Sequence, residues 1–173
     1  MPTRVMIMGL GPIGAGVARQ LVAPKNFKLV SAVDIDPAKA GQDLAEVLGL
    51  PKKTGVRVVP DAAAAIRKAK PQVAVLCTSS SLKRVMAQLE TVIKLKVPIV
   101  STTEELSYPW YSQRALARKV DRMAKKARVA VVGNPNGAAR ITLDREDPWG
   151  FHASLRTSFQ TSGRTGAPTR KGA

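Results

Sequence analysis

Apolar residues recur along the first three quarters of the chain in two alternating patterns. Short apolar runs rich in Val and Ile alternate with longer stretches in which apolar residues return every three or four positions. The short runs predict buried β-strands, and the longer stretches predict helices. We expect strands at residues 5–8, 27–33, 56–59, 73–77, 98–101 and 129–132. We expect helices at residues 12–22, 37–49, 62–69, 82–95 and 111–127.

Six strands separated by five helices indicate a parallel α/β sheet. The composition agrees, because 45% of the residues are hydrophobic and only 4% are aromatic. Such a mixture suits strands that are covered by helices on both faces. We therefore predict a Rossmann-type, doubly wound sheet with strand order 3-2-1-4-5-6, which binds ligands at the carboxyl ends of its strands.

Residues 134–173 depart from this pattern. Residues 1–133 contain nineteen valines and residues 134–173 contain none. The later segment is rich in Arg, Thr, Ser, Gly and Pro, and it shows neither the strand period nor the helix period. A segment of this composition buries too little apolar surface to order itself. We expect one domain at 1–133 and a disordered or aberrant tail at 134–173. The single histidine, His152, lies in that tail and receives no role.

The first predicted strand runs directly into a G-x-G-x-x-G motif that opens the first predicted helix. Its residues are Gly9, Leu10, Gly11, Pro12, Ile13 and Gly14. Gly9 permits a tight turn, Gly11 lets the backbone approach a pyrophosphate, and Gly14 lets helix and strand pack closely. The pyrophosphate would then lie on free N–H groups at the positive end of the helix dipole. We predict that these six residues bind a dinucleotide.

A carboxylate supports this prediction, because Asp34 ends the second strand twenty residues after the last glycine of the motif. Asp34 can accept hydrogen bonds from both hydroxyls of the adenosine ribose, and it would repel a 2′-phosphate. NAD is therefore favoured over NADP. Asp36 either adds to that repulsion or caps the following helix, and we favour the cap. Lys39 and the pair at residues 52–53 can offset the negative charge.

Small hydroxyl residues follow the fourth predicted strand. Thr78, Ser79 and Ser80 either line the nicotinamide-ribose region or, with Ser81, cap the next helix. We include the first three among the cofactor-binding residues. Cys77, inside the strand, is interpreted as packing. Residues 104–105, both Glu, follow the fifth strand and either contact a cationic substrate or are solvated.

The chain is strongly basic, with a formal net charge of +16. We do not expect nucleic-acid binding, because no aromatic residues interleave with the basic run at residues 114–128 to stack on bases. Attraction of an anionic cofactor or substrate is a simpler role. No apolar run approaches the ~20 residues that span a bilayer. The single cysteine fits a reducing compartment, so a cytoplasmic location is expected. No metal-ligand cluster is visible.

Residues 4–133 resemble the N-terminal NAD(P)-binding domain of the dihydrodipicolinate reductase family, and most closely its 2,4-diaminopentanoate dehydrogenase-like branch. The resemblance rests on the glycine motif, Val33-Asp34, residues 43–49, Thr78-Ser79-Ser80 and residues 104–110. It implies NAD(P)-dependent hydride transfer at an imine or amine carbon of a small amino-acid-like substrate. In dihydrodipicolinate reductases, this reaction is a step of lysine biosynthesis.

The resemblance also implies a C-terminal domain that holds substrate, supplies catalytic residues and builds the oligomer. After Gly133 the match decays within a few residues, and a shifted reading frame would produce such an ending. The expected function is the dinucleotide-binding half of an oxidoreductase, truncated before its substrate domain. The alternative is a non-catalytic NAD(P)-binding module. Catalytic residues, substrate and oligomeric state stay open.

Overall fold

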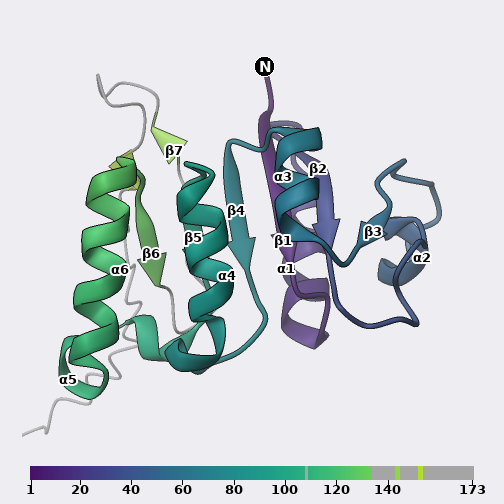
Figure 1. Cartoon of the computed structure of the whole chain (residues 1–173). Coiled ribbons are helices and arrows are strands. Elements are labelled where there is room, and N and C mark those ends of the chain that lie inside the picture. Colours follow the sequence, from purple (N-terminus) through teal and green to yellow (C-terminus); the bar gives the residue numbers. More distant parts are fainter. Residues whose placement is uncertain (108, 134–142, 145–151, 154–173) are drawn as a thin grey trace, which may run out of the picture. The chain divides into compact units, whose positions relative to one another are not determined.

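Six parallel strands form one sheet in the order β3-β2-β1-β4-β5-β6 in the computed structural model (Figure 1). The model describes residues 1–107, 109–133, 143–144 and 152–153. The strands are β1 (Thr3–Met8), β2 (Phe27–Val33), β3 (Val58–Val59), β4 (Val73–Leu76), β5 (Ile99–Ser101) and β6 (Val131–Gly133). Every neighbouring pair in this sheet is parallel. The predicted doubly wound order is confirmed.

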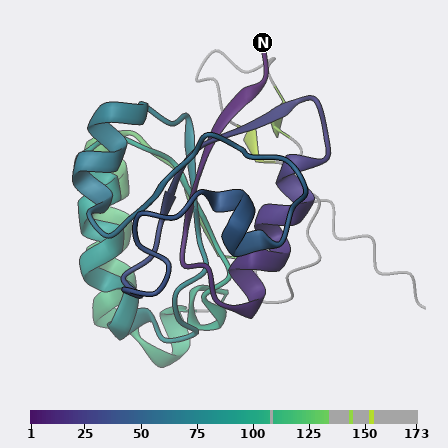
Figure 2. The ribbon, with the colours of Figure 1, turned by 90° about the vertical axis from the view of Figure 1, so that its right-hand side faces the viewer.

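Helices cover both faces of this sheet (Figure 2). One face carries α1 (Pro12–Val22) and α2 (Leu44–Leu48). The other carries α3 (Ala62–Ala69), α4 (Leu82–Lys94) and α6 (Arg114–Ala127). In the described part of the chain, no helix combines the length and apolar character needed to cross a membrane.

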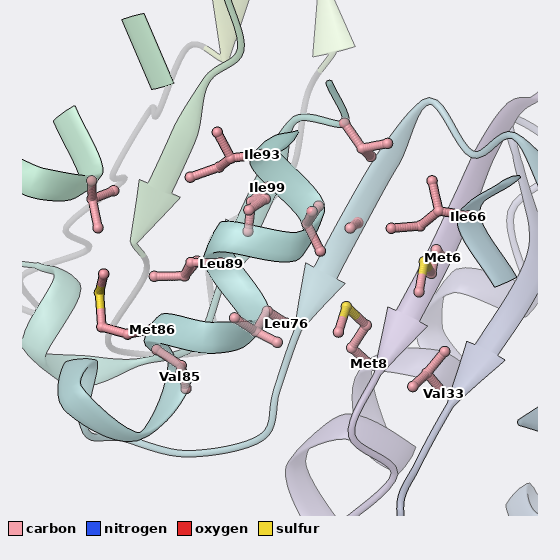
Figure 3. Close-up of a cluster of buried hydrophobic side chains, with 14 of the residues drawn as sticks. Met6, Met8, Val33, Ile66, Leu76, Val85, Met86, Leu89, Ile93 and Ile99 are labelled. Atoms are coloured by element: carbon pink, nitrogen blue, oxygen red, sulfur yellow. The ribbon is translucent and has the colours of Figure 1, made fainter. Parts of the chain in front are cut away.

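The alternation of side chains along β1 divides the core between the two faces. Val5 and Ile7 join the cluster under α1 and α2. Met6 and Met8 join the cluster under α3, α4 and α6, where Figure 3 shows Met6 near Ile66. All four β1 side chains are at most 2% exposed. Successive residues of a strand point to opposite faces, so both helical layers are fixed to the same central strand.

The helix predicted at residues 37–49 is much shorter in the structure. Only Leu44–Leu48 is helical, and residues 37–41 form turns. Gly41 has a φ of +83° and its amide donates to the Val58 carbonyl at 2.8 Å, while the Val58 amide donates to Gln42 at 3.0 Å. These backbone bonds hold the segment beside β3 and prevent it from continuing as a helix.

The chain between β5 and β6 also differs from its prediction. Between the strand expected at 98–101 and the helix expected at 111–127, the structure contains a 3-10 helix, η1 (Glu104–Leu106). The expected helix at 111–127 is divided into α5 (Pro109–Ser112) and α6, because Gln113 adopts a non-helical φ of −136°. Two short helical elements, η1 and α5, therefore precede the long helix α6.

The chain divides into two compact units, residues 1–138 and 139–173. In the second unit, β7 (Leu143–Asp144) and β8 (His152–Ala153) pair as antiparallel strands. The expectation of a disordered or aberrant tail otherwise falls on residues outside the described ones.

Candidate dinucleotide-binding site

The glycine loop after β1 leaves no room for side chains at two of its three glycines. Gly9 has a φ of +86°, and a Cβ added to it would lie 2.7 Å from the Cys77 carbonyl oxygen. A Cβ added to Gly14 would lie 1.8 Å from the Gly9 carbonyl oxygen. The Gly9 amide donates to the Val33 carbonyl at 2.8 Å. The loop is thus folded tightly between β2, the end of β4 and the start of α1.

Gly11, the third glycine, stands in open space. A Cβ added there would have no described atom within 4 Å, and its φ of −66° is ordinary. Gly11 is the N-cap of α1, and among the described residues no side chain caps the first turn. Pro12 occupies the first helical position, and the first turn has no acidic residue. Uncapped amides at the positive end of a helix favour an anion.

Asp34 connects the end of β2 to the glycine loop. Its side chain is 10% exposed, and Oδ2 accepts a hydrogen bond from the Leu10 amide at 2.7 Å. Oδ1 accepts from the Asp36 amide at 2.9 Å. Burial alone would raise the pKa of the Asp34 carboxyl, but these two amides and Lys39 outweigh it and lower the pKa. The carboxylate is therefore held in its charged form beside the loop.

Lys39 lies between the two acidic residues that follow β2. Its Nζ is 3.4 Å from Asp34 Oδ2 and 3.2 Å from Asp36 Oδ2. Asp36 accepts from the Ala38 amide at 3.0 Å, so it closes the turn at this point and does not cap a helix. Lys52 and Lys53 are exposed, and within the described residues neither forms an ion pair with these carboxylates.

The loop after β4 lies directly against the glycine loop. A Cβ at Gly9 would be 2.8 Å from Thr78 Cγ2, and the Thr78 hydroxyl donates to Gln88 on α4. Ser79 Oγ accepts from the Ser81 amide at 3.2 Å. The fold thus brings Thr78, Ser79 and Ser80 to the same sheet edge as the glycine motif, as expected of loops that follow neighbouring parallel strands.

The serines do not cap α4, although the sequence left that role open. The side chain of Ser81, the N-cap residue, forms no capping hydrogen bond to the helix. Glu105 performs this role instead, since its Oε2 accepts from the Leu82 amide at 2.7 Å. The Glu105 carboxylate therefore stabilises the start of α4. Burial raises the pKa of the Cys77 thiol, and this side chain packs against the α1–α2 core, as the packing interpretation predicted.

Two buried hydroxyl residues were not recognised from the sequence as parts of the site. Ser101 and Thr103 are both 0% exposed. The Thr103 hydroxyl donates to the Ser79 carbonyl at 2.8 Å, and the Ser101 hydroxyl donates to Thr103 Oγ1 at 2.9 Å. Their partners lie up to 25 residues away along the chain, and no motif spacing indicates them.

An exposed isoleucine was also missed. Ile35 directly follows Asp34 and is 81% exposed, and Ile13 on α1 is 62% exposed. Both side chains belong to segments at the carboxyl edge of the sheet, where apolar surface beside polar groups is characteristic of a ligand site.

The η1 helix closes the same edge on the side of β6. A Cβ added to Gly133 would lie 2.6 Å from Leu106 Cβ. The last residue of β6 therefore touches the segment that carries Glu105. Within the described residues, no group of three or more His, Cys, Asp or Glu side chains is placed to hold a metal ion.

Strand order and loop geometry together define a Rossmann-type domain with its candidate site at the switch point between β1 and β4. The sequence pattern of the family described as "Dihydrodipicolinate reductase, N-terminus" matches residues 3–136. The chain belongs to this family.

Individual relatives agree with that membership. The chain is 28% identical over 131 residues to a 2,4-diaminopentanoate dehydrogenase from Acetoanaerobium sticklandii, covering 75% of this chain and 37% of that protein. It is similar to an amine dehydrogenase structure from Mycobacterium smegmatis, with a TM-score of 0.74 and 32% identity over 78% of this chain and 39% of that one. A dihydrodipicolinate reductase from Paenisporosarcina sp. TG-14 shares the fold, with a TM-score of 0.61 and 21% identity over 79% of this chain and 48% of that one.

Proposed function

We propose that residues 1–133 bind NAD(P) at the carboxyl edge of the sheet. In this proposal the domain is the dinucleotide-binding half of an oxidoreductase that acts on an imine or amine carbon of a small amino-acid-like substrate. The observation that carries the proposal is the uncapped start of α1, with open space at Gly11 and the Asp34 carboxylate beside it. When bound, the nicotinamide ring accepts or donates the hydride.

The residues present fit such a group. Open space at Gly11 lets a pyrophosphate approach the backbone, and the first turn of α1 has no acidic residue to repel it. Free amides and the helix dipole then stabilise the negative charge. Asp34 keeps its charge through the amides of Leu10 and Asp36, so it can accept hydrogen bonds from ribose hydroxyls. Ile13 and Ile35 offer exposed apolar surface beside these polar groups.

The preference for NAD over NADP belongs to the same proposal. A 2′-phosphate would come close to the charged Asp34, and like charges repel in a partly buried site. Lys39 works in the opposite direction because its ammonium group already lies within 3.4 Å of both carboxylates. The net effect is a preference for NAD that Lys39 weakens.

Amine chemistry is supported by the relatives and not by any catalytic residue of this chain. The 32%-identical structure is an amine dehydrogenase, and the curated relative is a diaminopentanoate dehydrogenase. This chain spans 37% of the curated relative and 39% of that structure. The second candidate function is a non-catalytic NAD(P)-binding module, which the uncapped start of α1 and the Asp34 carboxylate would serve equally well. Lysine biosynthesis and a cytoplasmic location stay predictions.

Titration and turnover separate the two candidates. The full chain is titrated with NADH and NADPH by fluorescence and calorimetry, then assayed with diamino acids, simple amines and dihydrodipicolinate-type substrates. Binding with turnover supports the enzyme, and binding without turnover supports the module. Absence of dinucleotide binding in the folded protein would falsify both. Residues 1–133 alone, tested in parallel, are expected to keep the same NADH affinity, because the candidate site lies within them.

A further inference from the structure

We propose that Thr103 is a positioning residue that fixes the nicotinamide half of the site without touching the ligand. The inference rests on the proposed function, because it assumes that Thr78, Ser79 and Ser80 line the nicotinamide-ribose region. Its physical basis is a buried hydrogen-bond chain that connects the end of β5 to the loop after β4.

Each member of this chain has a defined donor and acceptor role. The Thr103 hydroxyl donates to the Ser79 carbonyl at 2.8 Å and accepts from the Ser101 hydroxyl at 2.9 Å. The Thr103 amide in turn donates to Ser101 Oγ at 3.1 Å. A hydroxyl has one proton to donate. The Thr103 proton goes to the Ser79 carbonyl, and the Ser101 proton is shared between Thr103 Oγ1 and the more distant Leu76 carbonyl, at 3.2 Å. Both residues are 0% exposed, and water does not compete for these bonds.

The Ser79 carbonyl is the point at which this chain controls the loop. A carbonyl belongs to a peptide plane, so fixing its direction also restrains the backbone of Ser79 and the residue after it. A second contact supports the first, since the Glu105 amide donates to the Ser80 carbonyl at 3.2 Å. Two successive carbonyls of the loop are therefore fixed from residues 103–105. Thr78, the preceding residue, lies against Gly9.

The other half of the site is independent of this chain of bonds. The glycine loop touches Thr78 but has its own hydrogen bonds, to the Val33 carbonyl and to Asp34, and among the described residues neither of these two is hydrogen-bonded to Thr103. Loss of the Thr103 hydroxyl should therefore weaken binding of the nicotinamide half and spare binding of the adenosine and pyrophosphate half. A purely structural role would affect both halves together.

The test compares NADH with ADP, which carries only the adenosine and pyrophosphate half. Thr103→Val keeps the shape of the side chain and removes the hydroxyl. Thr103→Ser restores the hydroxyl, and Ser101→Ala removes the partner that donates to it. Thr91→Val is the matched control, because in the described part of the chain the Thr91 hydroxyl bonds within α4, to the Ala87 carbonyl. All variants are made in the full chain and titrated by calorimetry.

Thr103→Val should weaken NADH binding by about fivefold to tenfold, the loss expected of roughly one displaced hydrogen bond. Its ADP affinity should stay within about twofold of the wild type, since ADP lacks the nicotinamide half. Thr103→Ser and Thr91→Val should retain wild-type affinity for both ligands. Ser101→Ala should shift NADH binding in the same direction as Thr103→Val, and it serves as the test should Thr103→Val not fold.

Any of three results would overturn the inference while leaving the proposed function intact. One is an equal loss of NADH and ADP affinity in Thr103→Val and Ser101→Ala, which would mean general destabilisation. The second is a wild type that binds NADH no better than ADP, and the third is a set of variants that keep the full NADH advantage. A wild type that binds neither ligand would instead contradict the proposed function itself.

Discussion

The two halves of the candidate site are built by different means. On the β1–β2 side, the groups offered to a ligand are backbone amides, and the sequence supplies glycines and one carboxylate, Asp34. On the β4–β5 side, three polar side chains form hydrogen bonds within the protein: Ser101, Thr103 and Glu105. In the proposed site, the first half leaves backbone amides free for a ligand, and the second half is a scaffold that holds a loop in place.

The largest expected effect comes from a substitution that changes only the β1–β2 half of the site. Gly11→Val should abolish dinucleotide binding, because the new side chain occupies the space where the pyrophosphate would approach. The fold should persist, since a Cβ there meets no described atom within 4 Å and φ is −66°. Titration with NADH and thermal melting measure the two outcomes.

Gly14→Ala provides the contrast within the same motif. Its Cβ would lie 1.8 Å from the Gly9 carbonyl oxygen, so the loop must shift. Overpacking of this kind typically destabilises by about 1–3 kcal/mol and occasionally more. Gly14→Ala should therefore lower the melting temperature, and Gly11→Val should not. Unchanged NADH affinity in Gly11→Val would show that the glycine loop does not bind the dinucleotide.

A smaller loss is expected at the carboxylate that joins β2 to the loop. Asp34→Ala should weaken NAD binding by about 1.5–3 kcal/mol, the range for hydrogen bonds to a charged group. NADP binding should weaken much less or improve, because a like charge is removed. Asp36→Ala is the matched control, since the Asp36 side chain is the neighbouring carboxylate, accepts from the turn amide of Ala38 and pairs with Lys39.

Parallel titrations with NAD and NADP decide this prediction. A wild type that prefers NADP, together with an Asp34→Ala protein that keeps the same preference, contradicts the assignment of Asp34 to the ribose. Equal effects of the Asp34 and Asp36 substitutions would show that only the net charge matters.

The scaffold half should respond through stability. Glu105→Ala removes the carboxylate that accepts from the Leu82 amide at the start of α4. Loss of a helix cap costs about 0.5–2 kcal/mol. Glu104→Ala is the control, as its neighbour on the same 3-10 helix. Urea unfolding should show a lower midpoint for Glu105→Ala only, and equal midpoints for the two variants would contradict the capping role.

The smallest effect appears only in acid and concerns the turn before α2. Four hydrogen bonds to Asp43, led by the one from the Ala45 amide, lower the pKa of its carboxyl from 3.8 to about 2. A lowered folded-state pKa stabilises the protein above the unfolded value, and this contribution is lost as the pH falls from 3.8 to about 2. Asp43→Asn should flatten the fall in melting temperature over this interval. An unchanged slope would show that other carboxylates dominate acid unfolding.

The sequence predicted the β1–β2 half well because its requirements are local. A strand, three glycines at fixed spacing and an acid at the end of the next strand form one continuous pattern, and all of these residues lie at the expected edge. The strand order followed from the alternation of elements. The end of the helix predicted at 37–49 was right, but its first half was wrong. The backbone at residues 41–42 is hydrogen-bonded to β3, which begins seventeen residues after Gly41, and a local pattern does not indicate such a pairing.

The scaffold half could not be predicted in this way. Thr103 bonds to a backbone carbonyl 24 residues away, and any residue at position 79 would offer the same carbonyl. Glu105 caps a helix that begins 23 residues before it. Sequence spacing does not encode such pairings, since they arise only when two parallel strands bring their following loops together.

The contact between Gly133 and Leu106 has a practical consequence for protein engineering. A Cβ at Gly133 would lie 2.6 Å from Leu106 Cβ, so this position accepts no larger residue without displacing η1. Glu105 and Thr103 lie on or next to that helix. A chimera that joins a new substrate domain after β6 should therefore place its junction beyond residue 133 and retain the glycine. A junction one residue earlier would replace Gly133 and displace η1. That displacement would in turn disturb the loop after β4, which Thr103 and Glu105 hold in place.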